Sequence, residues 1–403
     1  MTPFSPRIGM IMAVALRALA IPVFSLAACQ REQPAIRASL SLSEALATGD
    51  TAGYRRATGP RPFAFPADHG PHPGFRVEWW YFTGNLESDL GRRFGFQLTF
   101  FRSAQTPDPL PRTSAWAATD VWMAHLALTD ADGERFHAYE RLARGAAGLA
   151  GARAEPFSVW LEDWEVRSMS RTETFPVRLH AAAGDVAINL ELQRGKPIVV
   201  QGDGGFSAKG AERGDASHYY SLTRMPAQGK LVLSNVQHDV SGNAWLDREW
   251  STSGLGANLV GWDWLAVQLD DGRDLMLYRL RRRDGTADPF SAGTLVSASG
   301  ETTPLAAHDF VLEAVGEWRS PIDGTTYPRS WRARVPSSGL DITITPVLPA
   351  QELNLTVRYW EGAVDVSGSV TGRGYLEMTG YAGPPGERTG PAGRYGSPAF
   401  NAF

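Results

Sequence analysis

Apolar and polar residues alternate in several short stretches of this chain. Within residues 94–100, aromatic or aliphatic residues alternate with small or polar ones, the period of two expected of a strand with one buried face. The alternation continues over residues 123–128 and returns over residues 136–142, after a loop at 129–133 that contains Asp and Gly. This arrangement predicts a β-hairpin with a Gly-containing loop.

A second hairpin is predicted later in the chain. Residues 264–269 and 275–280 are rich in apolar side chains, and the turn sequence Asp270-Asp271-Gly272 separates them. Further short strands are predicted at residues 186–192, 341–345 and 375–381. No long stretch with a 3.6-residue period follows the N-terminal segment, so the predicted fold class is all-β with few helices.

Two pairs of segments resemble each other at long spacing. Glu78-Trp79 and Glu249-Trp250 each precede strands and an Asp-Gly turn, and residues 184–188 are echoed by residues 340–344. Two related β modules explain both echoes; chance similarity between strands is the alternative. Each module is too long for a small sandwich, which favours two β-barrels in tandem.

The aromatic content bears on what such barrels would hold. A barrel of about eight strands encloses packed side chains or one small ligand. The 13 Trp, 18 Phe and 11 Tyr residues would line an interior suited to a hydrophobic small molecule. The alternative is that these aromatics form ordinary hydrophobic core.

The N-terminus has the features of a bacterial lipoprotein signal. An apolar run at residues 18–28 follows Arg17; it has the length of a signal-peptide core, roughly 7–15 residues, and is too short to span a bilayer. The run ends in Leu26-Ala27-Ala28-Cys29, which resembles a lipobox. Cys29 is the only cysteine, so no disulfide framework is available. The alternative is a signal-anchored chain with an incidental cysteine.

Lipid on Cys29 would hold the chain on a membrane, since each buried acyl CH₂ contributes about 0.8 kcal/mol. Gln30 resembles the sorting signal for the outer membrane, so we expect a cell-envelope protein that faces the periplasm. Residues 30–66 do not alternate and predict a tether, with a short helix at 41–48 where Ser41 and Glu44 have capping-box spacing. The predicted organisation is a signal peptide at 1–28, a lipidated tether at 29–61, and β domains at 62–243 and 244–403.

The net charge of the chain argues against nucleic acid as a binding partner. The net charge is −4 and the pI is about 6.1, which gives no electrostatic basis for binding nucleic acid. No later stretch is long and apolar enough to be a transmembrane helix.

The most specific segment is residues 65–85, which contains His69, His72 and the run Glu78-Trp79-Trp80. It resembles the opening of the AttH / carotenoid 1,2-hydratase family, and the resemblance extends to about Tyr381. The resemblance implies two lipocalin-like β domains in tandem.

The resemblance also implies a site. Hydratases of the family carry a His-x-Trp pair and a later Tyr-x-Asp pair, and the matching positions here are His218 with Tyr220 and Trp245 with Asp247. Tyr220 replaces Trp and Trp245 replaces Tyr, so both positions stay aromatic. Residues 248–251 differ from the His- and Gly-containing text of the hydratases, which puts carotenoid as the substrate in doubt.

Alkene hydration without a cofactor needs a proton donor and protection for a carbocation. Desolvation would keep Asp247 protonated, so it is the candidate donor. Trp245 and Tyr220 would steady the cation through their ring faces, and His218 would position or deprotonate the attacking water. The alternatives are an ion-paired Asp247 in a turn, a hydrogen-bonded strand histidine at 218, and ordinary core aromatics.

Other sequence motifs do not predict a metal site or a nucleophilic serine. Asp68, His69 and His72 lie close in sequence but lack a distant further ligand, so no metal site is predicted. No Gly-x-Ser-x-Gly motif occurs. Two functions stay open: a cofactor-independent hydratase of an isoprenoid or other unsaturated lipid, and a non-catalytic lipid carrier or accessory factor to a transport system. A hydratase should gather Asp247, His218 and Tyr220 around one cavity.

Overall fold

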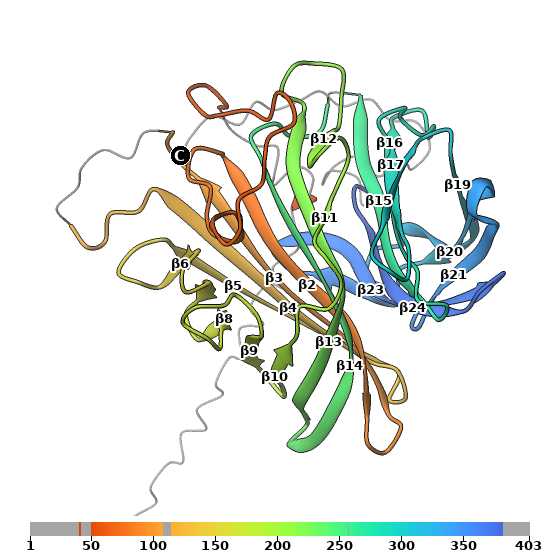
Figure 1. The fold of residues 1–403 in the computed structure, drawn as a ribbon. Coiled ribbons are helices and arrows are strands. Elements are labelled where there is room, and N and C mark those ends of the chain that lie inside the picture. The colour runs from red at the N-terminus through yellow and green to blue at the C-terminus, as the bar shows by residue number, and fades with distance from the viewer. Residues whose placement is uncertain (1–39, 42–49, 108–113, 257, 382–403) are drawn as a thin grey trace, which may run out of the picture. The chain divides into compact units, whose positions relative to one another are not determined.

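The protein is all-β. The computed structural model describes residues 40–41, 50–107, 114–256 and 258–381, and these residues belong to one compact unit. Two antiparallel sheets, each curved into a barrel or half-barrel, follow one another along the chain (Figure 1). The predicted fold class is therefore confirmed. Within the described residues, helical structure is limited to two 3₁₀ turns, η1 (Ala67–His69) and η2 (Pro336–Ser338).

The first sheet contains every strand from β2 to β14. Its order is β5-β4-β3-β2-β14-β13-β10-β9-β8-β7-β6, with β11 and β12 paired to β13. The strands are β2 (Val77–Ser88), β3 (Arg93–Ala104), β4 (Asp120–Asp130), β5 (Arg135–Arg144), β6 (Ala150–Arg153), β7 (Ser158–Leu161), β8 (Trp164–Ser168), β9 (Val177–Ala183), β10 (Val186–Leu192), β11 (Val199–Val200), β12 (Phe206–Ala208), β13 (Ala216–Leu233) and β14 (Val236–Ser251).

The second sheet contains the later strands. Its order is β18-β17-β16-β15-β24-β23-β21-β20-β19, with β22 and the N-terminal β1 paired to β23. The strands are β1 (Leu40–Ser41), β15 (Leu259–Leu269), β16 (Asp274–Arg282), β17 (Ala292–Val296), β18 (Thr302–Ala306), β19 (Val311–Arg319), β20 (Thr326–Val335), β21 (Leu340–Pro346), β22 (Glu352–Asn354), β23 (Val357–Gly368) and β24 (Gly372–Met378).

The two sheets share a topology. In each, four strands form a meander, and the last strand of the module returns to pair with the first: β14 with β2, and β24 with β15. The echo between residues 184–188 and 340–344 fits this, because β10 and β21 occupy matching places. The other echo has a different origin, since Glu78-Trp79 and Glu249-Trp250 are direct cross-strand partners within the first sheet.

The chain crosses between the sheets after β14. The predicted division at residues 243 and 244 falls within β14, and the second sheet begins at Leu259. The described end of the predicted tether is packed against the body: Ala57 is fully buried, and the Tyr54 hydroxyl donates to the Ala104 carbonyl. Most of the predicted helix at 41–48, and Cys29, lie outside the described residues.

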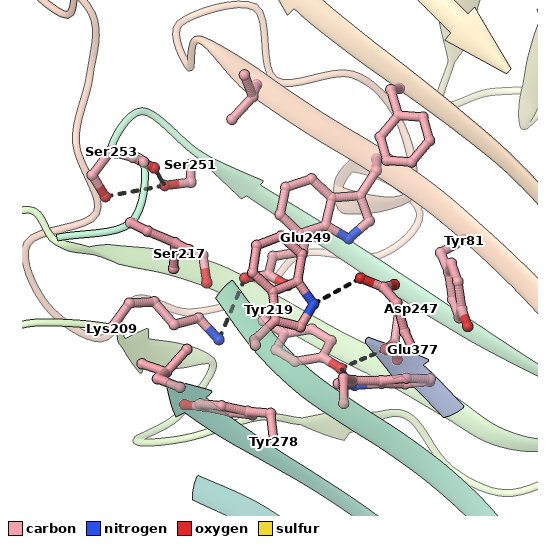
Figure 2. A pocket seen from close by; sticks show the side chains of 18 of the residues that line it. Tyr81, Lys209, Ser217, Tyr219, Asp247, Glu249, Ser251, Ser253, Tyr278 and Glu377 are labelled. Atoms are coloured by element: carbon pink, nitrogen blue, oxygen red, sulfur yellow. Dashed lines mark hydrogen bonds and ion pairs between the residues drawn. The ribbon is translucent and has the colours of Figure 1, made fainter. Parts of the chain in front are cut away.

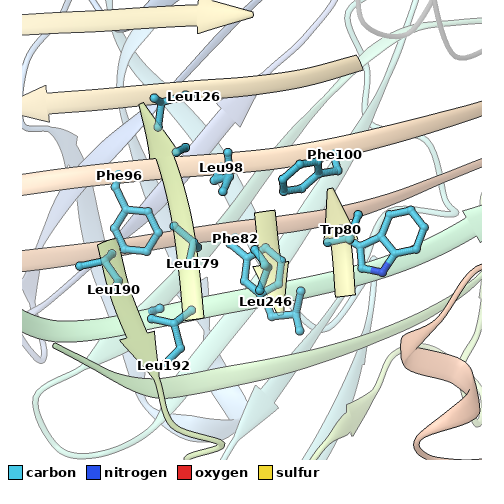
Figure 3. Close-up of a cluster of buried hydrophobic side chains, with 14 of the residues drawn as sticks. Trp80, Phe82, Phe96, Leu98, Phe100, Leu126, Leu179, Leu190, Leu192 and Leu246 are labelled. Carbon is cyan, nitrogen blue, oxygen red and sulfur yellow. The ribbon is translucent and has the colours of Figure 1, made fainter. Parts of the chain in front are cut away.

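The core of the first sheet lies on one face of its long strands. Trp80, Phe82, Leu98, Phe100 and Leu246 are buried there, alternating with residues that face the other way (Figure 3). This is the period of two that the sequence pattern predicted. The opposite face of the same strands is therefore available to meet the second sheet.

A buried ion network fixes the end of this sheet. The Glu78 carboxylate accepts hydrogen bonds from Arg102 and Arg248, and all three side chains are at most 3% exposed. The Arg248 guanidinium also lies 3.7 Å from the ring centroid of Trp80. The Glu-Trp-Trp segment thus contributes Glu78 and Trp80 to the interior of the first sheet, while Trp79 faces the other side.

A β-bulge interrupts the pairing of β13 with β14. A two-residue turn at Ser234 and Asn235, both with positive φ, pairs Leu233 with Val236, as in a type I′ hairpin. That register holds up to Met225, and beyond the bulge it shifts by one residue. Such a shift reverses which residues of the strand face the core on the two sides of the bulge. In β13 the buried core residues accordingly have even numbers before the bulge, up to Leu222, and odd numbers after it, from Met225.

The second sheet holds the bulge in place. Asp274 on β16 accepts hydrogen bonds from Thr223 Oγ1 at 2.7 Å and Arg224 Nε at 2.9 Å. Lys196 Nζ lies 2.8 Å from the same carboxylate, which is fully buried. Gln268 on β15 donates to the Thr223 carbonyl at 2.7 Å. Contacts with the second sheet thus determine which side chains the first part of β13, before the bulge, directs toward that sheet.

Candidate functional site: an aromatic cavity between the two sheets

A cavity lies where the outer face of β2, β13 and β14 meets β15, β16, β23 and β24 (Figure 2). Its empty space is about 1000 Å³ with the mouth that opens to solvent, and the centres of water molecules can occupy about 130 Å³ of it. Its aromatic lining consists of Trp79, Tyr81, Phe101, Tyr219, Trp262, Trp264 and Tyr278. Such a lining suits an apolar ligand or a group with developing positive charge.

Asp247 is the central polar group of the cavity wall. Its carboxylate accepts hydrogen bonds from Tyr219 Oη at 2.5 Å, Ser221 Oγ at 2.5 Å and Trp245 Nε1 at 2.6 Å. Trp264 Nε1 in turn donates to Tyr219 Oη at 3.2 Å. Asp247 is 4% exposed. Burial raises the pKa of Asp247 to about 7 although its three donors lower it, so its proton can leave or return near neutral pH.

Two glutamates face the cavity from the second sheet. Glu361 on β23 and Glu377 on β24 are cross-strand partners, so their side chains lie on one face. Burial raises the pKa of Glu377 to about 8, and it raises that of Glu361 well above its usual range. Trp262 Nε1 donates to Glu377 Oε1 at 2.7 Å, and Gln97 Nε2 donates to Glu361 Oε2 at 2.7 Å.

The other end of the cavity is polar and carries a cation. Lys209 Nζ lies 3.9 Å from the ring centroid of Tyr278 and 3.7 Å from the Glu249 carboxylate. Ser217 and Ser251 line the same end (Figure 2). The cavity therefore has a Lys209–Glu249 pair at one end, and Asp247, Glu377 and Tyr81 at the other.

The structure separates the four residues predicted from the resemblance. Trp245 and Asp247 lie together on the cavity face of β14, joined by a hydrogen bond. His218 and Tyr220 lie on the face of β13 that points away from the cavity. The residues that alternate with them, Ser217, Tyr219 and Ser221, face the cavity or Asp247. The bulge is the physical reason. Without the one-residue shift, Asp247 would pair with Leu222 and share a face with Tyr220.

His218 and Tyr220 belong to the interior of the first sheet. The Tyr220 hydroxyl lies 2.6 Å from His69 Nδ1 and is fully buried. His218 packs edge-on against Phe75 and near Trp250, and burial lowers its pKa to about 4. His218 is therefore neutral near neutral pH, and it does not line the cavity.

Sequence reasoning missed Tyr219, Ser221, Glu361, Glu377 and Lys209. Tyr219 and Ser221 alternate with the residues that were chosen, and only the register of β13 against β14 decides between the two sets. The glutamates lie more than a hundred residues from Asp247 and reach it through the pairing of β23 with β24. Nothing in the local sequence marks either one.

The acidic and histidine cluster near residue 70 is engaged in ion pairs. Asp68 lies 2.5 Å from Arg61 and 3.1 Å from His72, and His72 lies 3.3 Å from Glu78. Within the described residues, no group of three or more His, Cys, Asp and Glu side chains is arranged to hold a metal ion. A search of the same residues finds no helix with the length and apolar character needed to cross a membrane.

Comparison with known proteins gives one family. The family model described as AttH-like matches residues 56–381. A crystal structure of an AttH protein from Nitrosomonas europaea is 33% identical, with a TM-score of 0.72; the match covers 81% of this chain and 100% of that one. Kievitone hydratase from Nectria haematococca is 15% identical, with a TM-score of 0.61, over 85% of this chain and 97% of that one.

A further structure, that of CghA, is 13% identical over 83% of this chain and 97% of that one, with a TM-score of 0.50. At such identities, kievitone hydratase and CghA show a shared fold alone. None of the curated proteins matches this sequence.

Proposed function

This chain belongs to the AttH-like family, and from that premise we propose that it is a cofactor-independent hydratase of an apolar, unsaturated lipid such as an isoprenoid. The observation that carries the proposal is Asp247: a carboxyl group whose pKa lies near neutrality, buried in the wall of an aromatic cavity and oriented by three donors. The hydratase named among the structural neighbours is consistent with this chemistry.

The cavity supplies what alkene hydration needs. An isolated double bond takes up a proton to give a carbocation, and a water molecule then adds to that cation and releases a proton. The ring faces of Trp264 and Tyr219 would stabilise the cation, by about 0.5–2 kcal/mol for each contact. The enclosing aromatics limit the water that can reach it. Asp247 exchanges one of the two protons with the reactants.

A non-catalytic lipid carrier, including one that serves a transport system, is the second candidate. It is favoured by the fact that Asp247 is fully hydrogen-bonded by its neighbours, while His218 and Tyr220 do not converge on the cavity. Such a protein would use the same aromatic cavity to hold the lipid and would leave its double bonds unchanged.

The two candidates are separated by incorporation of heavy oxygen. The purified body, beginning after Cys29, is incubated in heavy-oxygen water with squalene or with a total bacterial lipid extract, and products are identified by mass spectrometry. A hydratase gives a lipid heavier by one labelled water. Asp247→Asn should lower that rate by on the order of 10²–10⁴-fold, and the surface variant Asp365→Asn should keep it, since Asp365 is half exposed.

An apolar compound that co-purifies unchanged, with no labelled product, would favour the carrier. Equal rates for Asp247→Asn and the unmodified protein would remove Asp247 from the mechanism.

We also propose that the chain is exported and anchored in the outer membrane through lipid on Cys29, because Leu26-Ala27-Ala28-Cys29 resembles a lipobox. A membrane anchor keeps an apolar ligand close to the lipid phase. Metabolic labelling with a radioactive fatty acid tests this: the label should appear on the full chain and be absent from Cys29→Ala. Equal labelling of the two chains would contradict the anchor.

A further inference from the structure

Two buried carboxyl groups face each other in the cavity with little to neutralise them. Glu361 is 1% exposed and Glu377 is 8% exposed, and they are direct cross-strand partners on β23 and β24. Like charges in this position repel, and the repulsion is strong where water is excluded. Within the part of the chain that the structure describes, neither carboxyl forms an ion pair.

The groups that act on the pair are other acids and phenols. Tyr81 of β2 and Asp247 of β14 face the pair from the first sheet, and Tyr359 and Tyr375 flank it on its own strands; Glu249 of β14 adds a weaker repulsion on Glu377 from further along the cavity. The cation of the cavity, Lys209, is paired with Glu249 at the other end. Ionising both glutamates would therefore place two negative charges beside Asp247 without compensation.

Two polar atoms at this place face each other without a regular hydrogen bond. Tyr81 Oη and Glu361 Oε1 are buried and interact with each other, and among the described residues neither has a partner in regular hydrogen-bond geometry. Both residues line the cavity, and Tyr81 is the cross-strand partner of Asp247. Buried polar groups without partners are rare in folded proteins and often mark the place of a bound group. Here they border the space between Asp247 and the glutamate pair.

Asp247 is buried like the glutamates but has more hydrogen-bond donors. Three donors converge on its two oxygens, and hydrogen bonds to a carboxylate favour the ionised form. Two carboxyl sites of one cavity are thus distinguished by their surroundings. One is rich in donors and suits a base, while the other is crowded by like groups and suits an acid.

Resting on the hydratase function proposed above, we propose that the Glu361–Glu377 pair is protonated and donates a proton to the double bond, while Asp247 receives the proton of the attacking water and Tyr81 holds a polar oxygen of the reactants. In the forward direction, the carboxyl O–H bond breaks as the new C–H bond forms. Water then forms the C–O bond, and its proton passes to Asp247. Return of that proton from Asp247 to the pair, through the bound water or Tyr81, completes the cycle without a redox partner.

Protonation of the glutamate pair can be tested without a substrate. Infrared spectra at neutral pH should show the C=O stretch of protonated carboxyl groups, and the band should lose intensity in Glu361→Gln, Glu377→Gln and the double variant. Glu313→Gln is the matched control, because that side chain is half exposed and lies on β19. Circular dichroism establishes that each variant is folded. A band of unchanged intensity in the folded double variant would overturn the proposal.

The direction of proton transfer is tested by the pH dependence of squalene or lipid-extract hydration. The unmodified protein should give a bell-shaped profile, because the base must be ionised and the acid protonated. Glu361→Gln and Glu377→Gln should lower kcat by on the order of 10²–10⁴-fold and lose the alkaline limb, whereas Asp247→Asn should lose the acidic limb. A merely structural role would lower stability and leave both limbs in place.

The outcomes also separate this inference from the function on which it rests. If the unmodified protein hydrates no lipid, the hydratase function fails. The infrared band still decides whether the glutamate pair is protonated. If the unmodified protein is active, and Glu361→Gln and Glu377→Gln keep its rate and its alkaline limb, the glutamate pair is not the acid and the hydratase function stands.

Discussion

Glu361 and Glu377 are buried opposite each other on β23 and β24, with Trp262 as a hydrogen-bond donor to one and Gln97 to the other. Burial favours the protonated form of both, reinforced at Glu361 by repulsion from Glu377 and at Glu377 by repulsion from Asp247 and Glu249. The folded protein consequently retains a proton that the unfolded chain releases, and this difference couples stability to pH.

The contribution of Glu377 to the unfolding free energy should therefore fall as pH rises. The pKa of Glu377 is raised from 4.5 to about 8 on folding, so its contribution is fully present below the lower value and is lost as pH rises to the higher one. Glu377→Gln removes this titration, and above the upper pKa it should be more stable than the unmodified protein by on the order of a few kcal/mol. Denaturant unfolding across this pH range measures the effect. Parallel curves for Glu377→Gln, Glu313→Gln and the unmodified protein would contradict it.

Tyr219→Phe should raise the pKa of Asp247. The change removes the donor to Oδ2 and leaves the burial of Asp247 in place, so the ionised form loses support. A hydrogen bond to a charged group is worth about 1.5–3 kcal/mol, which corresponds to roughly one to two pKa units. The acidic limb of the pH–rate profile should move to higher pH by that amount. Tyr278→Phe, which lines the cavity without bonding to Asp247, should leave this limb unmoved.

Tyr220→Phe should affect stability and leave hydration of squalene or lipid extract unchanged. The hydroxyl is buried on the face away from the cavity, and its loss leaves His69 without this partner. Such a loss costs about 1–3 kcal/mol, measurable by denaturant unfolding. If Tyr220→Phe instead lowers kcat as strongly as Asp247→Asn and leaves stability unchanged, the active site must include the interior of the first sheet.

Asp274→Ala should be strongly destabilising. It removes the acceptor shared by Thr223, Arg224 and Lys196 at the bulge, and breaking a buried ion pair from one side costs about 3–5 kcal/mol. Asp271→Ala, on the same hairpin but exposed and paired with Arg273 at the surface, should change stability by less than about 1 kcal/mol. Similar unfolding free energies for the two variants would show that the bulge does not depend on Asp274.

Much of the fold could be predicted from alternation. The predicted strand at 186–192 coincides with β10, and both predicted hairpins are present as β4–β5 and β15–β16. β10 has one buried face, so its side-chain pattern reports the strand directly, whereas β4, β15 and β16 are buried on both faces for most of their length and were predicted from apolar runs that flank an Asp- and Gly-containing loop. The packing of residues 50–61 on the body was not predicted, because a segment without periodicity carries no such signal.

The candidate site could be predicted only in part. Asp247 and Trp245 are two residues apart on one strand, so they necessarily share a face. The relation of this pair to His218 and Tyr220 depends on how β13 aligns with β14, and an unpaired residue at the bulge cannot be read from the local pattern. Glu361 and Glu377 depend on pairing within the other sheet and on how the two sheets meet, which no local pattern reports.

The bulge at Thr223 and Arg224 also has an evolutionary consequence. Removing a single residue there would abolish the bulge and keep Ser221 opposite Asp247, whereas extending the register of the turn at Ser234 through the bulge at unchanged length would make every earlier residue of β13 exchange faces. His218 and Tyr220 would face the second sheet, and Tyr219 and Ser221 would enter the interior of the first. In relatives of this protein, loss of the bulge at unchanged strand length would therefore relocate an entire set of site residues without any substitution among them. Aligning such relatives by motif alone would equate side chains that lie on opposite sides of one sheet.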